Sequence, residues 1–166
     1  MSRLKRAVFI FEEDAALPEG VKPLMLEAVL SCPILTWVGN QLRADGVQRF
    51  FAVCGPRFAE EARTLLPPDA AVSEQWADLA AFLDTEEPVL VLPRAAFPMA
   101  EAGPGFAYAA AGRELADAWR ERMTNNVQGA ELVSGWLPVY GPDTVAEIEA
   151  LLLRRGVSAP AGNGRA

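Results

Sequence analysis

The sequence contains no histidine at all. Histidine is the side chain whose ordinary pKa lies in the physiological range, and it is the commonest protein ligand of metal ions. Its absence excludes acid–base catalysis by imidazole, catalytic triads built on histidine and most zinc sites. Positive charge is also scarce: the sequence has 15 Lys and Arg residues against 22 Asp and Glu residues, which gives a net charge of −7. A general attraction to nucleic-acid phosphates or anionic lipid is therefore not expected.

Cysteine and long apolar runs are scarce as well. The only cysteines, Cys32 and Cys54, lack the spacing of metal ligands, and we expect buried thiols rather than a disulfide or a nucleophile. No apolar run is long enough to span a bilayer. The apolar run behind the basic start of the chain ends at Glu12, so no secretory signal is expected. These features predict a cytoplasmic protein without nucleic-acid or membrane partners.

What the sequence does contain is an alternation of short apolar runs and helical patterns over 166 residues, the size of one domain. Continuous apolar runs predict strands buried on both faces, and apolar residues at helical spacing predict amphipathic helices. Strands are expected at 7–11, 50–53, 70–72, 89–92, 106–108 and 136–140. Helices are expected at 33–45, 58–65, 76–83, 114–123 and 142–153. The tryptophans fall on apolar positions and are expected in the core: Trp37, Trp76, Trp119 and Trp136.

This alternation predicts an α/β fold, Rossmann-like, with a mainly parallel sheet and helices on both faces. We expect one domain over residues 1–157 and a disordered tail over 158–166, which is rich in Ala, Gly and Pro. Ligands of such sheets bind beyond the carboxyl ends of the strands. The loops after Phe11, Val53 and Leu92 are therefore the expected location of a functional site.

The most distinctive segment, residues 124–129, reads Thr-Asn-Asn-Val-Gln-Gly. It resembles the T-N-N-x-Q-G-E segment of the uridyltransferase domain of bifunctional bacterial UDP-N-acetylglucosamine pyrophosphorylases. Other blocks of that family have similar counterparts here in the same order, at Lys22, 32–35, 40–55, 74–75, 89–98 and Glu149. The resemblance implies a nucleotide-diphospho-sugar transferase-like fold and an ancestral reaction that joins a sugar 1-phosphate to a nucleoside triphosphate.

The sequence departs from that family where the chemistry takes place. The family's glycine-rich L-A-A-G-x-G-T-R-M loop lets backbone N–H groups wrap a triphosphate. Residues 11–17 replace it with a segment that has no glycine and carries three carboxylates, at Glu12, Glu13 and Asp14. The positions of the family's magnesium ligands hold Ala95 and Tyr140, which offer no carboxylate. 

The contacts to base and sugar are lost in the same way. The base-reading glutamine falls at Val72, and the glutamate of T-N-N-x-Q-G-E falls at Ala130. The long sugar-binding section of the family is reduced to a few residues around Gly105. We therefore predict no catalytic residues, no metal ligands and no cofactor.

Few candidate binding residues remain, and each has two interpretations. Lys22 and Arg94, with Arg57 at a helix start, are weak candidates for holding a small anion, and the alternative is that they are scattered surface cations. Arg94 and Tyr140 are alternatively side chains that fill the former pocket. The acidic run from Glu12 is either a cation site or a solvated turn.

Three functions are compatible with this pattern. The first, which we prefer, is a degenerate sugar-1-phosphate nucleotidyltransferase-like protein that is inactive and binds an unknown protein partner or a small metabolite. The second is a residual nucleotidyltransferase of the UDP-N-acetylglucosamine pyrophosphorylase type with an altered substrate, which would use Mg²⁺. The third is a structural subunit of an oligomer, for which a homo-oligomer is one expected form.

Overall fold

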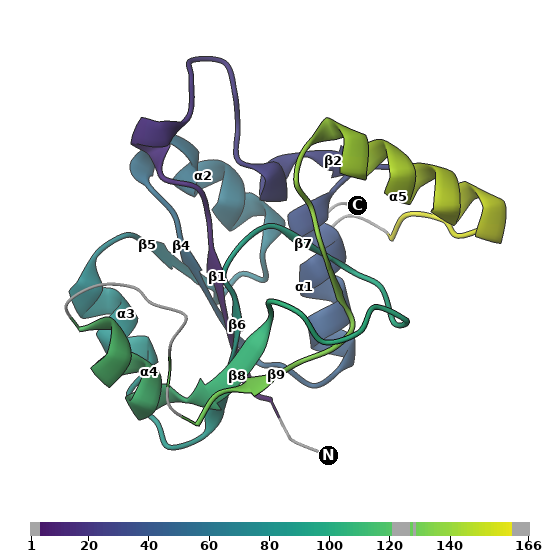
Figure 1. Cartoon of the computed structure of the whole chain (residues 1–166). Coiled ribbons are helices and arrows are strands. Elements are labelled where there is room, and N and C mark those ends of the chain that lie inside the picture. Colours follow the sequence, from purple (N-terminus) through teal and green to yellow (C-terminus); the bar gives the residue numbers. More distant parts are fainter. Residues whose placement is uncertain (1–3, 121–126, 128, 161–166) are drawn as a thin grey trace.

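The computed structural model describes residues 4–120, 127 and 129–160. Its centre is a six-stranded sheet with the strand order β5-β4-β1-β6-β8-β9 (Figure 1). The first four of these strands are parallel, β8 is antiparallel to β6, and β9 is antiparallel to β8. Their bounds are β1 Arg6–Ile10, β4 Arg49–Val53, β5 Ala71–Ser73, β6 Pro88–Leu92, β8 Tyr108–Ala111 and β9 Glu131–Leu132. The predicted α/β class and the mainly parallel sheet are confirmed, although the complete sheet is mixed.

Strand β1 lies inside the sheet, between β4 and β6, and its apolar side chains are buried on both faces of the sheet. Val8 pairs with Phe51 of β4 on one side and with Val91 of β6 on the other. Val8 and Phe9, which point to opposite faces, are both fully buried. The continuous apolar run therefore does mark a strand covered on both faces.

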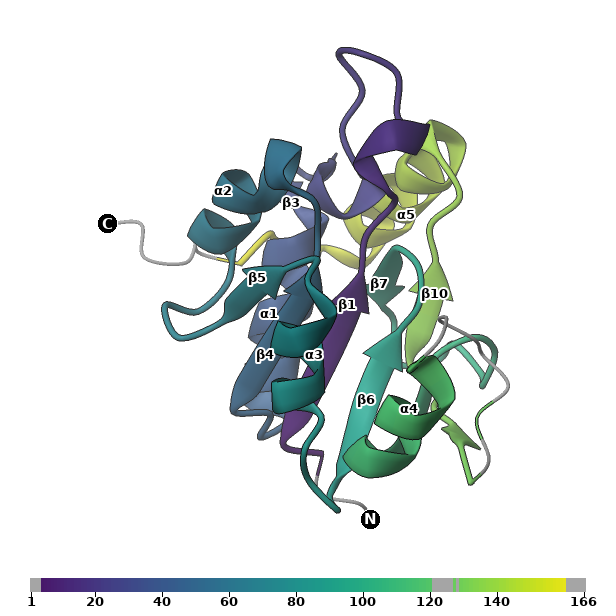
Figure 2. The same ribbon diagram turned by 90° about the vertical axis from the view of Figure 1, so that its left-hand side faces the viewer.

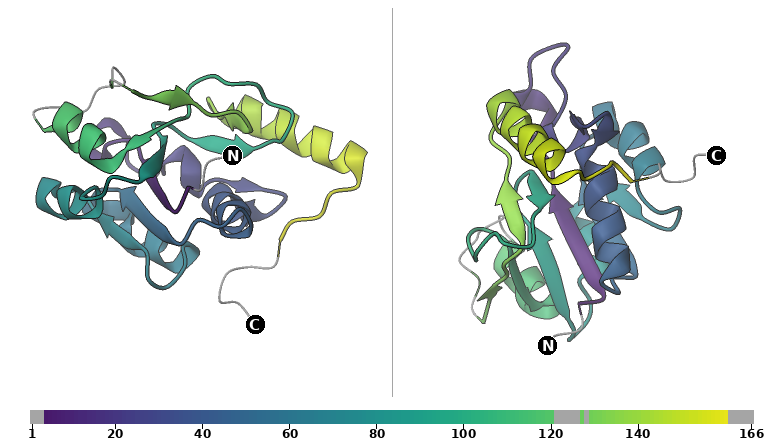
Figure 3. Two further views of the ribbon diagram at one scale, coloured as in Figure 1. Left: turned by 90° about the horizontal axis from the view of Figure 1, so that it is seen from below. Right: turned by 90° about the vertical axis from the view of Figure 1, so that its right-hand side faces the viewer.

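Helices cover both faces of the sheet (Figures 2 and 3). One core cluster joins Phe9 and Phe50 to residues of α1, α2 and α5, and a second joins Val8 and Phe51 to residues of α3 and α4. Each helix turns an apolar side toward the core, as its spacing predicts. The bounds are α1 Ile34–Ala44, α2 Pro56–Leu65, α3 Trp76–Phe82, α4 Gly112–Trp119 and α5 Pro142–Arg155.

Several small elements were not predicted. A hairpin joins β2 (Ala28–Val29) to β3 (Cys32–Pro33), and single turns of 3-10 helix occur at η1 (Asp14–Ala16) and η2 (Leu24–Leu26). The strand expected at 136–140 is shorter, β10 (Trp136–Pro138), and pairs with β7 (Ala96–Pro98) outside the main sheet.

Two expectations from local pattern were displaced or wrong. The strand expected at 106–108 begins only at Tyr108, because the following alanines pair with β6. Trp76 was expected in the core, yet it is 37% exposed at the start of α3, since the buried face of that short helix is formed by Leu79 and Phe82.

Some expectations fall on residues that the structure does not describe. Of segment 124–129, only Val127 and Gly129 are described, and of the tail at 158–166, only 158–160, which form no helix or strand. Within the described residues, no helix combines the length and the apolar character that crossing a bilayer requires.

Candidate functional site

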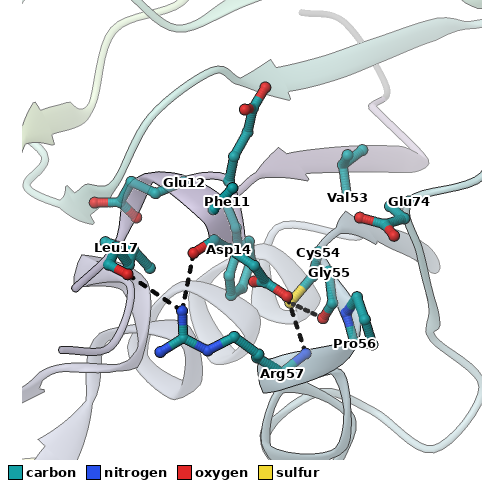
Figure 4. A pocket seen from close by; sticks show the side chains of 12 residues that line it. Phe11, Glu12, Asp14, Leu17, Val53, Cys54, Gly55, Pro56, Arg57 and Glu74 are labelled. Carbon is teal, nitrogen blue, oxygen red and sulfur yellow. Dashed lines mark hydrogen bonds between the residues drawn. The ribbon is translucent and has the colours of Figure 1, made fainter. Parts of the chain in front are cut away.

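A cleft of about 810 Å³ opens at the carboxyl ends of β1, β4 and β5. The loop after β1 and the first turn of α2 form its walls, and Phe11, Val53 and Cys54 contribute apolar surface (Figure 4). Parallel strands end at the same edge of the sheet, so the loops after Phe11 and Val53 meet there as the sequence predicted. The loop after Leu92 does not line this cleft.

The wall of the cleft is built by bonds between Asp14 and Arg57. The carboxylate of Asp14 accepts a hydrogen bond through Oδ2 from the backbone N–H of Arg57, at 3.0 Å. The guanidinium of Arg57 donates in return to the carbonyl oxygens of Asp14, at 2.9 Å, and Leu17, at 3.3 Å (Figure 4). A carboxylate is favourable at this position because the first N–H groups of a helix are unpaired and carry partial positive charge.

Gly55 provides the space for the Asp14 carboxylate. A Cβ atom at Gly55 would overlap Oδ2 of Asp14 and would lie 2.5 Å from its Cγ. The φ angle of Gly55 is −72°, which any residue adopts, so the need for glycine here is steric rather than conformational. Within the described structure, Oδ1 of Asp14 is buried without a hydrogen-bond partner.

The acidic run does not converge on a common point. Oε1 of Glu12 accepts a hydrogen bond from the backbone N–H of Leu24, at 3.2 Å, whereas Asp14 turns toward α2. Among the described residues, no three acidic or cysteine side chains are grouped so that they could hold a metal ion. The run is therefore neither a formed cation site nor simply a solvated turn, because the carboxylates of Glu12 and Asp14 accept hydrogen bonds from backbone N–H groups.

The cleft is strongly acidic. Glu12, Glu13, Asp14 and Glu74 line it, and Arg57 is the one cation among its lining residues. The guanidinium of Arg57 is already bonded to two carbonyl oxygens and also lies over the ring of Phe58, 4.9 Å from the centroid. A ligand in the cleft would therefore meet an excess of negative charge.

Cys54 lies at the edge of the same cleft, and its thiol donates to the carbonyl of Gly55 at 3.5 Å. Burial, followed by the negative charge of Asp14, raises the pKa of the Cys54 thiol from 9.0 to about 12. A thiol with this pKa is protonated at neutral pH and is a poor nucleophile. Both cysteines are buried and neither forms a disulfide in the described part of the chain, as the sequence predicted.

Lys22 and Arg94, the weak candidates for an anion site, occupy separate places. Nζ of Lys22 lies 3.1 Å from Oε2 of Glu61 on α2. Arg94 borders a smaller cavity of about 150 Å³ between the ends of β1 and β6, and its guanidinium lies 4.4 Å from the ring centroid of Tyr140. Neither residue lines the larger cleft, and Arg57, the third candidate, does.

The positions aligned with the magnesium ligands of the resembled family lie close together. Ala95 is buried, and its carbonyl accepts the N–H of Val139, the residue before Tyr140, at 3.0 Å. The ring of Tyr140 is covered on one side by Arg94. Arg94 and Tyr140 are both exposed, Tyr140 to 66%, so the alternative that these two side chains fill a pocket is wrong.

No family model matches the chain. No curated protein matches it either. The fold and the cleft therefore define an α/β protein with an acidic site at the carboxyl edge of a mixed sheet.

Proposed function

We propose that this chain is a degenerate nucleotidyltransferase-like domain, inactive in sugar-1-phosphate transfer, that binds a positively charged group of a protein partner or metabolite in its acidic cleft. The observation that carries the proposal is the Asp14 carboxylate bound to the first turn of α2. The first backbone N–H groups of a helix are a position that an anionic ligand can take. Here the position is filled by the protein's own anion.

Electrostatics disfavours a triphosphate in this cleft. Two unit charges about 4 Å apart interact with about 1 kcal/mol in water and about 4 kcal/mol near a protein surface. A triphosphate would face four carboxylates and one cation, Arg57, whose Nη1 is already bonded to Asp14 and Leu17. The same four carboxylates would attract a cationic group and so favour its binding.

The order of the strands supports descent from a nucleotidyltransferase. The chain runs outward from β1 to β4 and β5 and then returns to β6 on the other side of β1, so the order of parallel strands reverses between β1 and β6. That reversal is typical of doubly wound nucleotide-binding sheets.

The inactivity is tested with Mg²⁺, UTP and N-acetylglucosamine 1-phosphate. We expect no release of pyrophosphate and a flat calorimetric titration with UTP, CTP, GTP and ATP, while an active pyrophosphorylase assayed in parallel responds. Pyrophosphate release faster than in a control reaction that lacks the protein would refute the proposal.

The cationic ligand is tested by titration with a lysine pentapeptide at low salt. We expect binding that weakens as salt is added, because the attraction is screened, and that is lost in the variant Glu12→Gln/Glu13→Gln/Glu74→Gln. The matched control, Asp69→Asn/Glu114→Gln/Glu131→Gln, removes the same charge from exposed sites outside the cleft. Equal loss of binding in both variants would show that net charge, not the cleft, attracts the peptide.

A further inference from the structure

Helix α5 presents a second apolar side to solvent. Ile148 and Leu152 are buried against the body of the protein, whereas Leu153 is 66% exposed. Val157, just beyond the helix, is 38% exposed. Exposed Ala146 and Ala150 precede Leu153 at helical spacing, and these three residues form one apolar line, which we call the α5 stripe. 

The helix also lies at the margin of the molecule and projects beyond it (Figures 1 and 3). Single exposed apolar residues are ordinary on protein surfaces, but an apolar line along a projecting helix is typical of an interaction site. Because Leu153 is 66% exposed, packing among the described residues does not explain an apolar side chain at this position.

Two charged residues flank the stripe on the same side. Glu147 lies in the first half of α5 and Arg154 in the second, seven residues later, which is close to two helical turns. At a rise of 1.5 Å per residue they are about 10 Å apart along the axis, too far to pair with each other. Neither takes part in an ion pair among the described residues, although neighbouring Arg155 pairs with Glu101.

We propose that the α5 stripe binds the same stripe of a second copy of this chain, with the two helices antiparallel about a twofold axis near Ala150. In this arrangement the first half of each helix faces the second half of the other. Glu147 then lies opposite the partner's Arg154, and the twofold axis repeats the pair. In a parallel pair the flank that carries Glu147 and Arg154 would lie on opposite sides of the interface in the two copies, so these charges would not meet, and only the antiparallel arrangement pairs them.

The sizes of the side chains fit the same arrangement. Ala150 lies at the axis, where a small side chain lets two helices approach closely. The large side chain of Leu153 falls over the small side chain of the partner's Ala146, and large-against-small contacts pack well. A helix of 14 residues is about 21 Å long, so this contact buries less area than a standard interface, and the dimer is weak and concentration-dependent.

Sedimentation equilibrium over a micromolar-to-millimolar concentration series tests the proposal. We expect a monomer–dimer equilibrium for the wild type and at least a tenfold rise in the dimer dissociation constant for Leu153→Asp, by analogy with charges placed in interface cores, where roughly 1.4 kcal/mol is a factor of ten. Circular dichroism identifies any variant that fails to fold. A wild type that stays monomeric throughout overturns the proposal, even if the stripe captures a different protein.

A charge exchange tests the antiparallel arrangement independently of folding. Glu147→Arg and Arg154→Glu, made singly, each place like charges opposite each other and should weaken the dimer several-fold. The double variant Glu147→Arg/Arg154→Glu restores opposite charges across the axis and should recover the wild-type constant. A double variant no better than the single ones overturns the arrangement. The proposal does not depend on the cleft or its ligand.

Discussion

Asp14 and Arg57, 43 residues apart in the chain, are joined by hydrogen bonds in both directions. The Asp14 carboxylate accepts from the backbone N–H of Arg57 at 3.0 Å, and the Arg57 guanidinium donates to the carbonyl of Asp14 at 2.9 Å. The bonds fasten the loop after β1 to the first turn of α2. They give the acidic loop a defined position in the cleft and occupy Nη1 of Arg57, the one cation among the lining residues.

The first prediction concerns the charge of Asp14. Asp14→Asn keeps the shape of the side chain but removes the charge at the helix start, so we expect a loss of about 1 kcal/mol of unfolding free energy. Urea denaturation measures it. The control is Glu13→Gln, which removes one exposed carboxylate of the same loop and should change stability by less than about 0.5 kcal/mol. Equal effects of the two substitutions would contradict a specific role of Asp14.

The second prediction concerns the steric role of Gly55. Gly55→Ala places a methyl group where the Asp14 carboxylate lies, and we expect a loss of about 1–3 kcal/mol of unfolding free energy as the loop is displaced. In an Asp14→Ala background the obstructing atoms are gone, so the same substitution should be neutral or stabilise by about 0.5 kcal/mol. A double-mutant cycle by urea denaturation measures this coupling. Additive effects would show that the two residues do not interact.

The third prediction concerns the reactivity of Cys54, measured by alkylation with iodoacetamide in a Cys32→Ala variant. Because the folded pKa is raised from 9.0 to about 12, the thiolate fraction at pH 8 falls about a thousandfold, and alkylation should slow accordingly relative to the urea-unfolded chain. The folded rate should go on rising with pH above 9, where the unfolded rate levels off. A folded rate that levels off near pH 9 would be incompatible with the raised pKa.

The fourth prediction concerns the turn between β2 and β3. Leu30 and Ser31 have φ angles of 53° and 64°, in the left-handed region that favours glycine or asparagine. Oε2 of Glu149 on α5 accepts the backbone N–H of Leu30 at 2.9 Å and holds this turn. Ser31→Gly should therefore raise the unfolding free energy by about 0.5–1 kcal/mol, and Glu149→Ala should lower it by about 1–2 kcal/mol.

Thermal and urea denaturation of these variants test the turn. Ser134→Gly is the matched control, because Ser134 is exposed and lies outside the residues with positive φ. It should be neutral or destabilising, since glycine adds entropy to the unfolded chain. If Ser31→Gly and Ser134→Gly both stabilised the protein, the positive φ of the turn would not explain the effect of Ser31→Gly.

The site was predicted only in part. The sequence located it, because the loops after Phe11 and Val53 follow buried parallel strands and must emerge at one edge. The glycine and Pro56 directly after a strand indicate the start of a helix. They do not indicate that Gly55 leaves space for the Asp14 carboxylate, which only the structure shows. Lys22 and Arg94 were grouped by charge alone, and the structure gives each a separate partner.

The sequence by itself determined the alternation of strands and helices and the burial of β1, because apolar periodicity is a local property that each segment carries. Only the tertiary structure decided that Trp136 and its neighbours pair with β7 rather than join the main sheet, and that Asp14 bonds to α2. Those outcomes depend on which segments meet in space. Hydrogen-bond partners 43 residues apart leave no trace in the local pattern of either segment.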